Sequence, residues 1–293
     1  MVFIESIEFG CIPHSIGRLK SVQQIEIFSN CITGELPKSL CDLTSLVNFD
    51  ASQNNLTGRL PNNFAALHLF SLGLNGNHLE GQIPEIIAFN PNLAKLKLFN
   101  NSFSGSLPRD LGSHSNLEVI DVSDNGFSGY FPPYLCNASK LQHLVAFNNA
   151  FSGELAGYYG DCNSLAYVRI FNNELSGEVP LRFWSLPRLY LLEMANNRFQ
   201  VSITPAIFGA RNLTKLLISG NKFNGKLSAE ICLLQELAVV DVSRNRLSGE
   251  LPLCITALYR LQKLDLQQNY LSGEIPSDVS TWKELTKLNL SET

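Results

Sequence analysis

The sequence lacks the features that direct a chain into a membrane or onto a nucleic acid or a metal. It has no run of about 20 apolar residues, so no segment is predicted to span a bilayer. The formal net charge is −4, which provides no basic field for nucleic acid or for an anionic membrane surface. No CxxC or Cys–His spacing predicts a metal site, and we expect no cofactor.

The N-terminus also lacks a secretion signal, although the chain carries acceptor sites for secretory glycosylation. Its first residues, MVFIESIEFGCIPHSIGRLK, have no charged start, apolar stretch or small-residue cleavage site. Asn-x-Ser/Thr sequons matter only in the secretory pathway. We therefore expect a piece of a longer secreted protein. The candidate glycosylation sites are Asn55, Asn100, Asn137, Asn212 and Asn289.

One pattern recurs along the whole chain. Residues 165–180, LAYVRIFNNELSGEVP, fit the template LxxLxLxxNxLSGxIP, in which Asn173 is the pivot. A fixed period of 24 residues, with one step of 23, is typical of leucine-rich repeats. The pivots are Asn30, Asn54, Asn77, Asn101, Asn125, Asn149, Asn173, Asn197, Asn221, Asn245 and Asn269.

This repeat predicts an α/β fold: a right-handed leucine-rich-repeat solenoid with a parallel sheet on its concave face and 3₁₀ or short helices on its convex face. We interpret residues 1–293 as a single array of about eleven full coils with a partial coil at each end. Neither end matches the polar or disulfide-closed caps of a solenoid, so we expect truncation at both ends. No kinase motif or membrane span is present.

Each column of the repeat has a predicted structural role. Val168 and Ile170 alternate with Arg169, the period-2 pattern of a half-buried strand. The pivot amides should form a ladder that satisfies backbone groups of neighbouring coils. A glycine column marks a turn that we expect to have positive φ, and Val201 interrupts it, predicting a local irregularity. The phenylalanines two residues past the pivots should stack inside the core: Phe103, Phe127, Phe151, Phe199 and Phe223.

The cysteine count is odd and predicts little cross-linking. Cys41, Cys136 and Cys232 share one column but lie about four coils apart, roughly 19 Å at ~4.8 Å per coil, too far for a disulfide. We expect buried free thiols in general. Only Cys232 and Cys254, in adjacent coils, are close enough to be considered as a pair.

The recurring S/T-G-x-I/L-P element resembles the plant-specific class of leucine-rich repeats over nearly the whole chain. Four segments carry a narrower resemblance: IGRLKSVQQIEIFSN, SLVNFDASQNNLTG, NPNLAKLKLFNNSFSGSLP and SLAYVRIFNNELSGEVPLRFWSLPRL. They resemble the ectodomains of HAESA-like receptor kinases. The resemblance implies recognition of a secreted, hydroxyproline-containing abscission peptide, together with a co-receptor of the somatic embryogenesis receptor kinase type.

The resemblance also implies which residues bind the ligand. Glu26 matches the family glutamate that accepts a hydrogen bond from the hydroxyproline, and the backbone around Phe49 and Ser71 matches the rest of that pocket. Arg169 matches one arginine of the RxR pair that holds the peptide's C-terminal carboxylate, which suits a guanidinium fork. Tyr167 stands where the first arginine of the pair is expected, a departure shared with some relatives.

The outward strand side chains should form the ligand face, and Asp121 and His143 are further candidates on it. Such a shallow surface favours an extended peptide over a small molecule. Six coils separate Glu26 from Arg169, about 29 Å, which an extended chain of about nine residues would span. Asp241 and Asp265 have a spacing that could mimic a glycosidase, but neighbouring lysines favour a charge network.

We therefore expect a non-enzymatic ligand-recognition fragment from the ectodomain of a plant receptor-like kinase, on the extracellular side of the plasma membrane. Its expected partners are a secreted peptide and a co-receptor, with no nucleic acid and no membrane contact by this fragment. The alternative is a kinase-less interaction protein, such as a polygalacturonase-inhibitor-like defence protein. That class also uses about ten 24-residue coils, but it closes both ends with disulfide caps.

Overall fold

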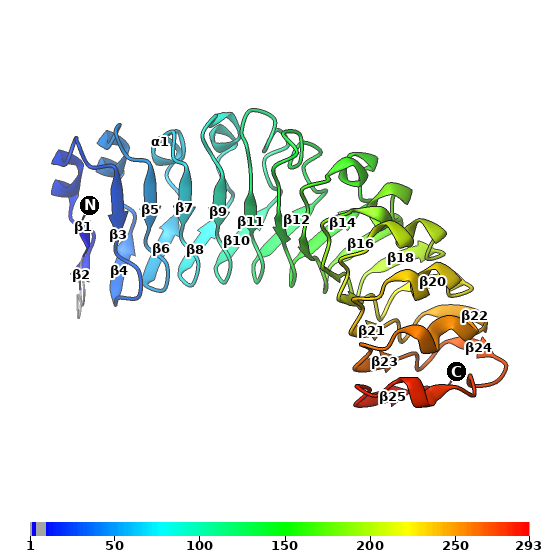
Figure 1. Ribbon diagram of the computed structural model, residues 1–293. Helices are drawn as coiled ribbons and strands as arrows, with labels where there is room; N and C mark the ends of the chain where they lie inside the picture. The colour runs from blue at the N-terminus through cyan, green and yellow to red at the C-terminus, as the bar shows by residue number, and fades with distance from the viewer. Residues whose placement is uncertain (1, 4–9, 293) are drawn as a thin grey trace. The chain divides into compact units, whose positions relative to one another are not determined.

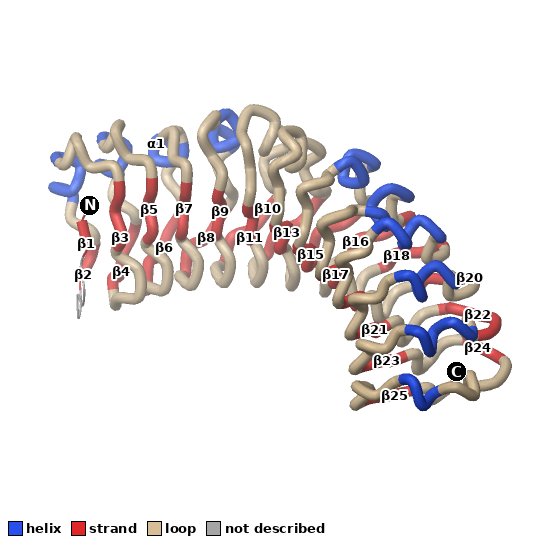
Figure 2. Tube along the Cα trace, in the orientation of Figure 1, coloured by secondary structure: helices blue, strands red, loops and turns tan. Residues whose placement is uncertain are grey.

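The computed structural model describes residues 2–3 and 10–292. The chain forms two compact units, Met1–Phe151 and Ser152–Thr293, and each is a stack of similar coils (Figure 1). In each coil a short strand of a long parallel sheet is followed by a strand of a second sheet and then by a helical or turn segment (Figure 2). This is the predicted leucine-rich-repeat solenoid.

The long sheet is built from one three-residue strand per coil, because only three residues of each repeat alternate between core and solvent. All described pairs are parallel and in register, as in Gln24↔Asn48↔Ser71. In the first unit the strands are β1 (Val2–Phe3), β3 (Gln24–Glu26), β5 (Asn48–Asp50), β7 (Ser71–Gly73), β9 (Lys95–Lys97), β11 (Val119–Asp121) and β13 (His143–Val145). In the second they are β15 (Tyr167–Arg169), β17 (Leu191–Glu193), β19 (Lys215–Leu217), β21 (Val239–Asp241), β23 (Lys263–Asp265) and β25 (Lys287–Asn289).

The second sheet follows the pivot asparagines. Its strands begin one to two residues after each pivot and run through the predicted glycine column. In the first unit they are β2 (Gly10–Cys11), β4 (Ile32–Glu35), β6 (Asn55–Arg59), β8 (His78–Gly81), β10 (Ser102–Gly105) and β12 (Gly126–Gly129). Strand β14 (Ala150–Gly153) lies at the boundary, and the second unit contains β16 (Glu174–Glu178), β18 (Arg198–Val201), β20 (Lys222–Gly225), β22 (Arg246–Glu250) and β24 (Tyr270–Ser272).

Short helices return the chain toward the next strand. Most start directly after a proline whose extended backbone sets the entry, and η4, η6 and η7 start in the same way after Ala156, Thr204 and Ser228. The helices are η1 (His14–Arg18), η2 (Lys38–Asp42), α1 (Asn62–Ala65), η3 (Glu85–Phe89), η4 (Gly157–Asp161), η5 (Leu181–Ser185), η6 (Pro205–Gly209), η7 (Ala229–Leu233), η8 (Leu253–Ala257) and η9 (Val279–Thr281). Among the described residues, none of these helices has the length and apolarity needed to cross a membrane.

The pivot ladder forms as predicted. Asn54 shows the pattern: its Oδ1 accepts from the amide of Ile32 in the preceding coil at 3.0 Å, and its Nδ2 donates to the carbonyls of Ile27 and Ala51 at 2.9 and 3.1 Å. Each such amide joins two coils by satisfying backbone groups that the strand geometry leaves unpaired. The side chain is therefore buried despite being polar, with Asn54 only 6% exposed.

The predicted aromatic column is confirmed within each unit. Phe103, Phe127 and Phe151 are fully buried, and their ring centroids follow one another at 6.2 and 6.0 Å in nearly parallel planes. Phe199 and Phe223 repeat the arrangement at 6.3 Å. These rings supply much of the apolar area that each coil buries against the next.

The glycine column is required for two reasons. Its members have φ between +73° and +85°, with +76° at Gly177, and a Cβ at Gly177 would lie 2.4 Å from Cγ of Glu154 in the preceding coil. Val201 occupies the column with φ +74°, and strand β18 keeps its register with Gln200↔Lys222. The prediction of an irregular coil is therefore wrong: the geometry is kept, and the β-branched side chain is held in a strained conformation.

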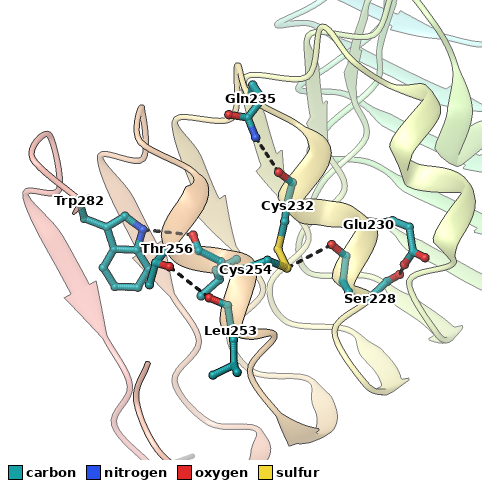
Figure 3. The surroundings of a disulfide bond; sticks show 10 residues. Ser228, Glu230, Cys232, Gln235, Leu253, Cys254, Thr256 and Trp282 are labelled. Carbon is teal, nitrogen blue, oxygen red and sulfur yellow. Dashed lines mark hydrogen bonds between the residues drawn. A yellow bond between two sulfur atoms is a disulfide. The ribbon is translucent and has the colours of Figure 1, made fainter. Parts of the chain in front are cut away.

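The prediction of buried free thiols is largely wrong. Cys232 and Cys254, the one pair considered, form a disulfide with S–S 2.14 Å between η7 and η8 (Figure 3). Cys136 and Cys162 are also disulfide-bonded. The three free cysteines are exposed or half-buried: Cys11, Cys31 and Cys41. Oxidised cysteines agree with an extracellular compartment.

The Cys232–Cys254 disulfide belongs to a polar network around the helical side of the second unit (Figure 3). Gln235 donates to the carbonyl of Cys232 at 2.7 Å, and Trp282 donates through Nε1 to the carbonyl of Ile255 at 3.2 Å. These hydrogen bonds satisfy carbonyls of η7 and η8, because helices this short cannot satisfy all of their own carbonyls.

Candidate ligand-binding face

In the three-residue strands from β3 to β23 the middle residue is buried and the first and third residues point to the open face, whereas Leu288 in the middle of β25 is 42% exposed. Strand β3 shows the alternation, since Ile25 is 1% exposed and Gln24 and Glu26 are half-buried. Phe49 is likewise a core residue at 1%, with its ring 5.0 Å from Phe64. Any ligand contact at Phe49 must therefore use its backbone, as the sequence analysis expected.

The first unit brings Glu26 and Ser71 to the same patch. Gln24 and Ser71 are joined in register through Asn48, while Glu26 aligns with Asp50 and Gly73. The carboxylate of Glu26 accepts a hydrogen bond from Nε2 of Gln24 on the same strand, which fixes its direction on the face. This role of Gln24 was not predicted from the sequence.

Gly73 adds no side chain to the open face beside this patch. A Cβ at Gly73 would lie 3.0 Å from Cγ and Oδ1 of Asp50, so a side chain there would crowd the aspartate. Asp50 itself is fastened, because its Oδ1 accepts from the amide and hydroxyl of Ser52 at 2.9 and 2.6 Å. One carboxylate oxygen of Asp50 is therefore structural.

The same hydrogen bond, from a serine two residues later, recurs at Asp121 and Asp241. Oδ1 of Asp121 accepts from the hydroxyl of Ser123 at 2.6 Å, and Oδ1 of Asp241 accepts from Ser243 at 2.7 Å. The signal is readable in the sequence as Asp-x-Ser at the end of a strand. Asp121 thus has a structural role in addition to its predicted place on the ligand face.

His143 lies on the face in register with Val119 of the preceding strand. Partial burial, and next the positive charge of Lys97, lower its pKa below the usual 6.5. A neutral imidazole is therefore favoured on this part of the face at neutral pH. Lys95, on the same strand as Lys97, lies over the ring of Phe70 with its Nζ 5.9 Å from the centroid.

The second unit places Arg169 in a dense cluster. Its Nε donates to Oε2 of Glu193 on the next strand at 2.6 Å, and its guanidinium lies 5.1 Å from the ring centroid of Phe171. Burial lowers the pKa of Arg169, but hydrogen bonds and charge from Glu193, together with Tyr167, more than offset this and raise it. Arg169 is therefore held in place and stays positively charged. Tyr167 lies beside it on strand β15.

Farther along the second unit, Asp241 and Asp265 belong to a charge network and not to a catalytic pair. Nζ of Lys263 lies 2.8 Å from Oδ2 of Asp241 and 3.8 Å from Oδ2 of Asp265, and Lys287 approaches Asp265 at 3.3 Å. Burial raises the pKa of Asp241, but Lys263 and Ser243 outweigh it and lower the pKa. A carboxylate that is held ionised in this way, as at Asp241, is unsuited to serve as a general acid.

Asp265 lacks the serine hydrogen bond that is seen at Asp50, Asp121 and Asp241. Residue 267 is Gln instead of Ser, and Oδ1 of Asp265 has no hydrogen-bond partner among the described residues although the side chain is 3% exposed. Within the same described range, no group of His, Cys, Asp or Glu side chains could hold a metal ion.

The sequons lie on different surfaces of the coils. The side chains of Asn55, Asn100, Asn137 and Asn212 are exposed. Asn289 is half-buried on the open face of β25, where its Oδ1 accepts from the hydroxyl of Ser291 at 2.9 Å. Four sequons thus have room for a glycan, and the fifth lies on the face expected to bind ligand.

Comparisons with known proteins agree with this geometry. The Leucine Rich Repeat family model matches residues 45–67, 92–114, 116–138, 212–234 and 260–282. A crystal structure of the Arabidopsis receptor kinase HAESA ectodomain, in complex with an N-terminally extended IDA peptide hormone, is 47% identical over 97% of this chain, with a TM-score of 0.95. The chain belongs to the HAESA-like ectodomains of plant leucine-rich-repeat receptor kinases.

Two further matched structures are plant receptors in complex with peptide hormones. Arabidopsis HAESA in complex with IDA and the co-receptor SERK1 is 42% identical over 98% of this chain, with a TM-score of 0.88. The plant receptor RGFR1 in complex with RGF2 is 32% identical over 97%, with a TM-score of 0.85. No curated protein sequence matches the chain.

This HAESA-like array spans about half of each solved relative: 48%, 53% and 49% of the three chains. The parts it matches are receptor ectodomains that bind ligands, so the array is not itself an enzyme.

Proposed function

We propose that this chain recognises a secreted, hydroxyproline-containing peptide on the open face of its long sheet, as part of a receptor kinase ectodomain at the extracellular side of the plasma membrane. The observation that carries the proposal is the oriented guanidinium of Arg169 on strand β15, in an array 47% identical to a HAESA ectodomain bound to IDA. In this proposal Arg169 and Tyr167 bind the peptide's C-terminal carboxylate.

In this proposal Glu26 binds the hydroxyproline of the peptide. Its carboxylate, aimed by Gln24, accepts the hydroxyl of the hydroxyproline, and Ser71 with the backbone at Phe49 completes that subsite. Asp121 and His143, on the paired strands β11 and β13 of the first unit, make further proposed contacts with the peptide. A SERK-type kinase is the proposed co-receptor, because a related complex contains SERK1. We further propose N-glycans at the exposed sequons Asn55, Asn100, Asn137 and Asn212.

Titration calorimetry with synthetic IDA peptide tests the proposal. Replacing Glu26 by Ala should weaken the hydroxyproline form roughly 10-fold or more, because a hydrogen bond to a charged acceptor contributes ~1.5–3 kcal/mol. The unhydroxylated peptide should be affected much less. Arg169→Ala should cost the free-acid peptide roughly 30-fold or more, since a desolvated charge contact contributes ~2–5 kcal/mol.

A matched control is Glu174→Ala, which removes the exposed partner of Arg198 on the second sheet and should leave binding unchanged. Equal affinity for hydroxylated and plain peptide in the wild-type chain, or no binding of either, would contradict the proposal.

A further inference from the structure

The carboxylate of Glu193 fixes the orientation of Arg169. Strands β15 and β17 pair with Arg169 directly opposite Glu193, and the two side chains are 29% and 17% exposed. The contact uses Nε, at 2.6 Å from Oε2, which is one of the five N–H groups that a guanidinium carries. A bond at Nε sets both the plane and the rotation of the fork, because Nε joins the fork to its flexible stem.

The flat face and the edge of the guanidinium are also supported. The ring of Phe171 lies against the face at 5.1 Å, and the guanidinium is hydrogen-bonded to the Tyr167 side chain. Tyr167 is packed in turn against Tyr190, with ring centroids 5.7 Å apart. All five side chains belong to the second unit, on or directly beside strands β15 and β17.

The Tyr167 hydroxyl can act in two directions at once. As acceptor it takes an N–H from Arg169, and its own O–H then remains a donor. A hydroxyl that accepts from a cation is polarised and becomes a better donor. It can therefore donate a hydrogen bond to a carboxylate where a second cation would otherwise bind it, without adding charge.

We propose that Glu193 is a positioning residue for Arg169 and that Tyr167 is the second donor, so that the cluster receives a planar, singly charged carboxylate at the ligand's chain terminus. This inference rests on the proposed function. Because Glu193 already neutralises Arg169, recognition depends on hydrogen-bond geometry more than on net charge. Salt should therefore weaken binding only slightly, unlike binding by an unpaired arginine pair.

The test compares synthetic IDA peptide with a free C-terminal carboxylate against the same peptide amidated at that end, using the wild-type chain and five variants, one of which is the Arg169→Ala variant introduced above. Glu193→Ala should weaken the free-acid peptide about 10-fold, but should change the amidated peptide less than twofold. Glu193→Gln keeps an acceptor within reach of Nε and should recover most of the lost affinity. Tyr167→Phe, which removes only the hydroxyl, should cost the free acid about 5-fold. Glu174→Ala remains the control.

An independent readout does not need a ligand. The Nε–H proton of Arg169, followed by NMR in arginine-labelled protein, should exchange slowly in the wild type and in Glu193→Gln, and rapidly in Glu193→Ala. Rapid exchange in the wild type would overturn the positioning role whatever the peptide does.

The outcomes separate the two proposals. If the wild type binds and Arg169→Ala abolishes the preference for the free acid, while Glu193→Ala has no effect, only the positioning role fails. It also fails if Glu193→Ala weakens both peptides equally, or if Glu193→Gln behaves like Glu193→Ala. If the wild type binds neither peptide form, the proposed function fails and the carboxylate receptor with it.

Discussion

Replacing Asn221 by Ala should remove a large part of the stability of the second unit. The side chain is 9% exposed, its Oδ1 accepts from the amide of Phe199 at 3.0 Å, and its Nδ2 donates to the carbonyls of Met194 and Ile218 at 2.9 and 3.1 Å. Alanine leaves the N–H of Phe199 buried without this acceptor, while the carbonyls of Met194 and Ile218 each lose one of two donors and keep Asn197 at 3.3 Å and Asn245 at 3.0 Å. At ~1–3 kcal/mol for the unsatisfied N–H and ~0.5–1.5 kcal/mol for each of the two lost hydrogen bonds to the carbonyls, we expect a loss of about 2–5 kcal/mol.

The loss should be visible both globally and at one amide. Urea unfolding followed by circular dichroism should give a lower midpoint at an unchanged slope, and hydrogen exchange should accelerate at the amide of Phe199. Asn221→Asp keeps the acceptor but turns a charge toward two carbonyls, so it should be at least as damaging as alanine.

Asn224 provides the control within the same coil. Its side chain is exposed, and Asn224→Ala should change stability by less than about 0.5 kcal/mol. If Asn221→Ala costs less than about 1 kcal/mol, or no more than Asn224→Ala, the buried amide is not what joins the coils and the account of the ladder is wrong.

Three further predictions concern the backbone strain at Val201, the unbonded Oδ1 of Asp265 and the pH dependence of stability. Val201→Gly should raise the free energy of unfolding by about 1 kcal/mol, because relief of strain at φ +74° exceeds the entropy cost of glycine; a lower urea midpoint would contradict this. Gln267→Ser should add about 1 kcal/mol by giving Oδ1 of Asp265 the hydroxyl that Ser243 gives Asp241, with the new bond checked by crystallography. Because the folded-state pKa of His143 is lowered, the stability it contributes is complete above pH 6.5 and is lost as pH falls toward the folded-state pKa. His143→Gln should flatten that dependence in melting curves recorded between about pH 5 and 7.5.

The features that repeat in every coil could be predicted from the sequence. The pivot at Asn54, the stacked rings of Phe103 and Phe127 and the outward direction of Glu26 each follow from a column that recurs many times. A column position determines which way a side chain points, because the strand and the turn are the same in each coil.

Features that depend on two particular coils were harder to predict. The oxidation of Cys136 and Cys162 was missed because only cysteines of one column were weighed beside the pair Cys232 and Cys254. Glu193 was likewise not assigned to Arg169, although opposite charges exactly one repeat apart on the open face are the available signal. Pairing across coils depends on which neighbour is present, and no single-column pattern contains that information.

The strain at Val201 could not be predicted either. A valine in a glycine column predicts a changed backbone if the coil is considered alone. In the structure β18 pairs with β16 and β20 on its two sides, and those ladders hold the backbone where glycine would place it. Neighbouring coils thus override a local preference, as packing commonly does for single-residue propensities.

The crowded glycines bear on how such receptors can be recombined. Glu154 covers Gly177, Arg59 covers Gly81 and Lys226 covers Gly249, so the side chain that fills each turn comes from the coil before it. A hybrid receptor spliced between that side chain and the next glycine brings together two surfaces that were never fitted to each other. Splice points placed directly after a column glycine, as between Gly153 and Glu154, keep each covering residue with the glycine that it covers, and blocks of coils exchanged there should fold with fewer repairs.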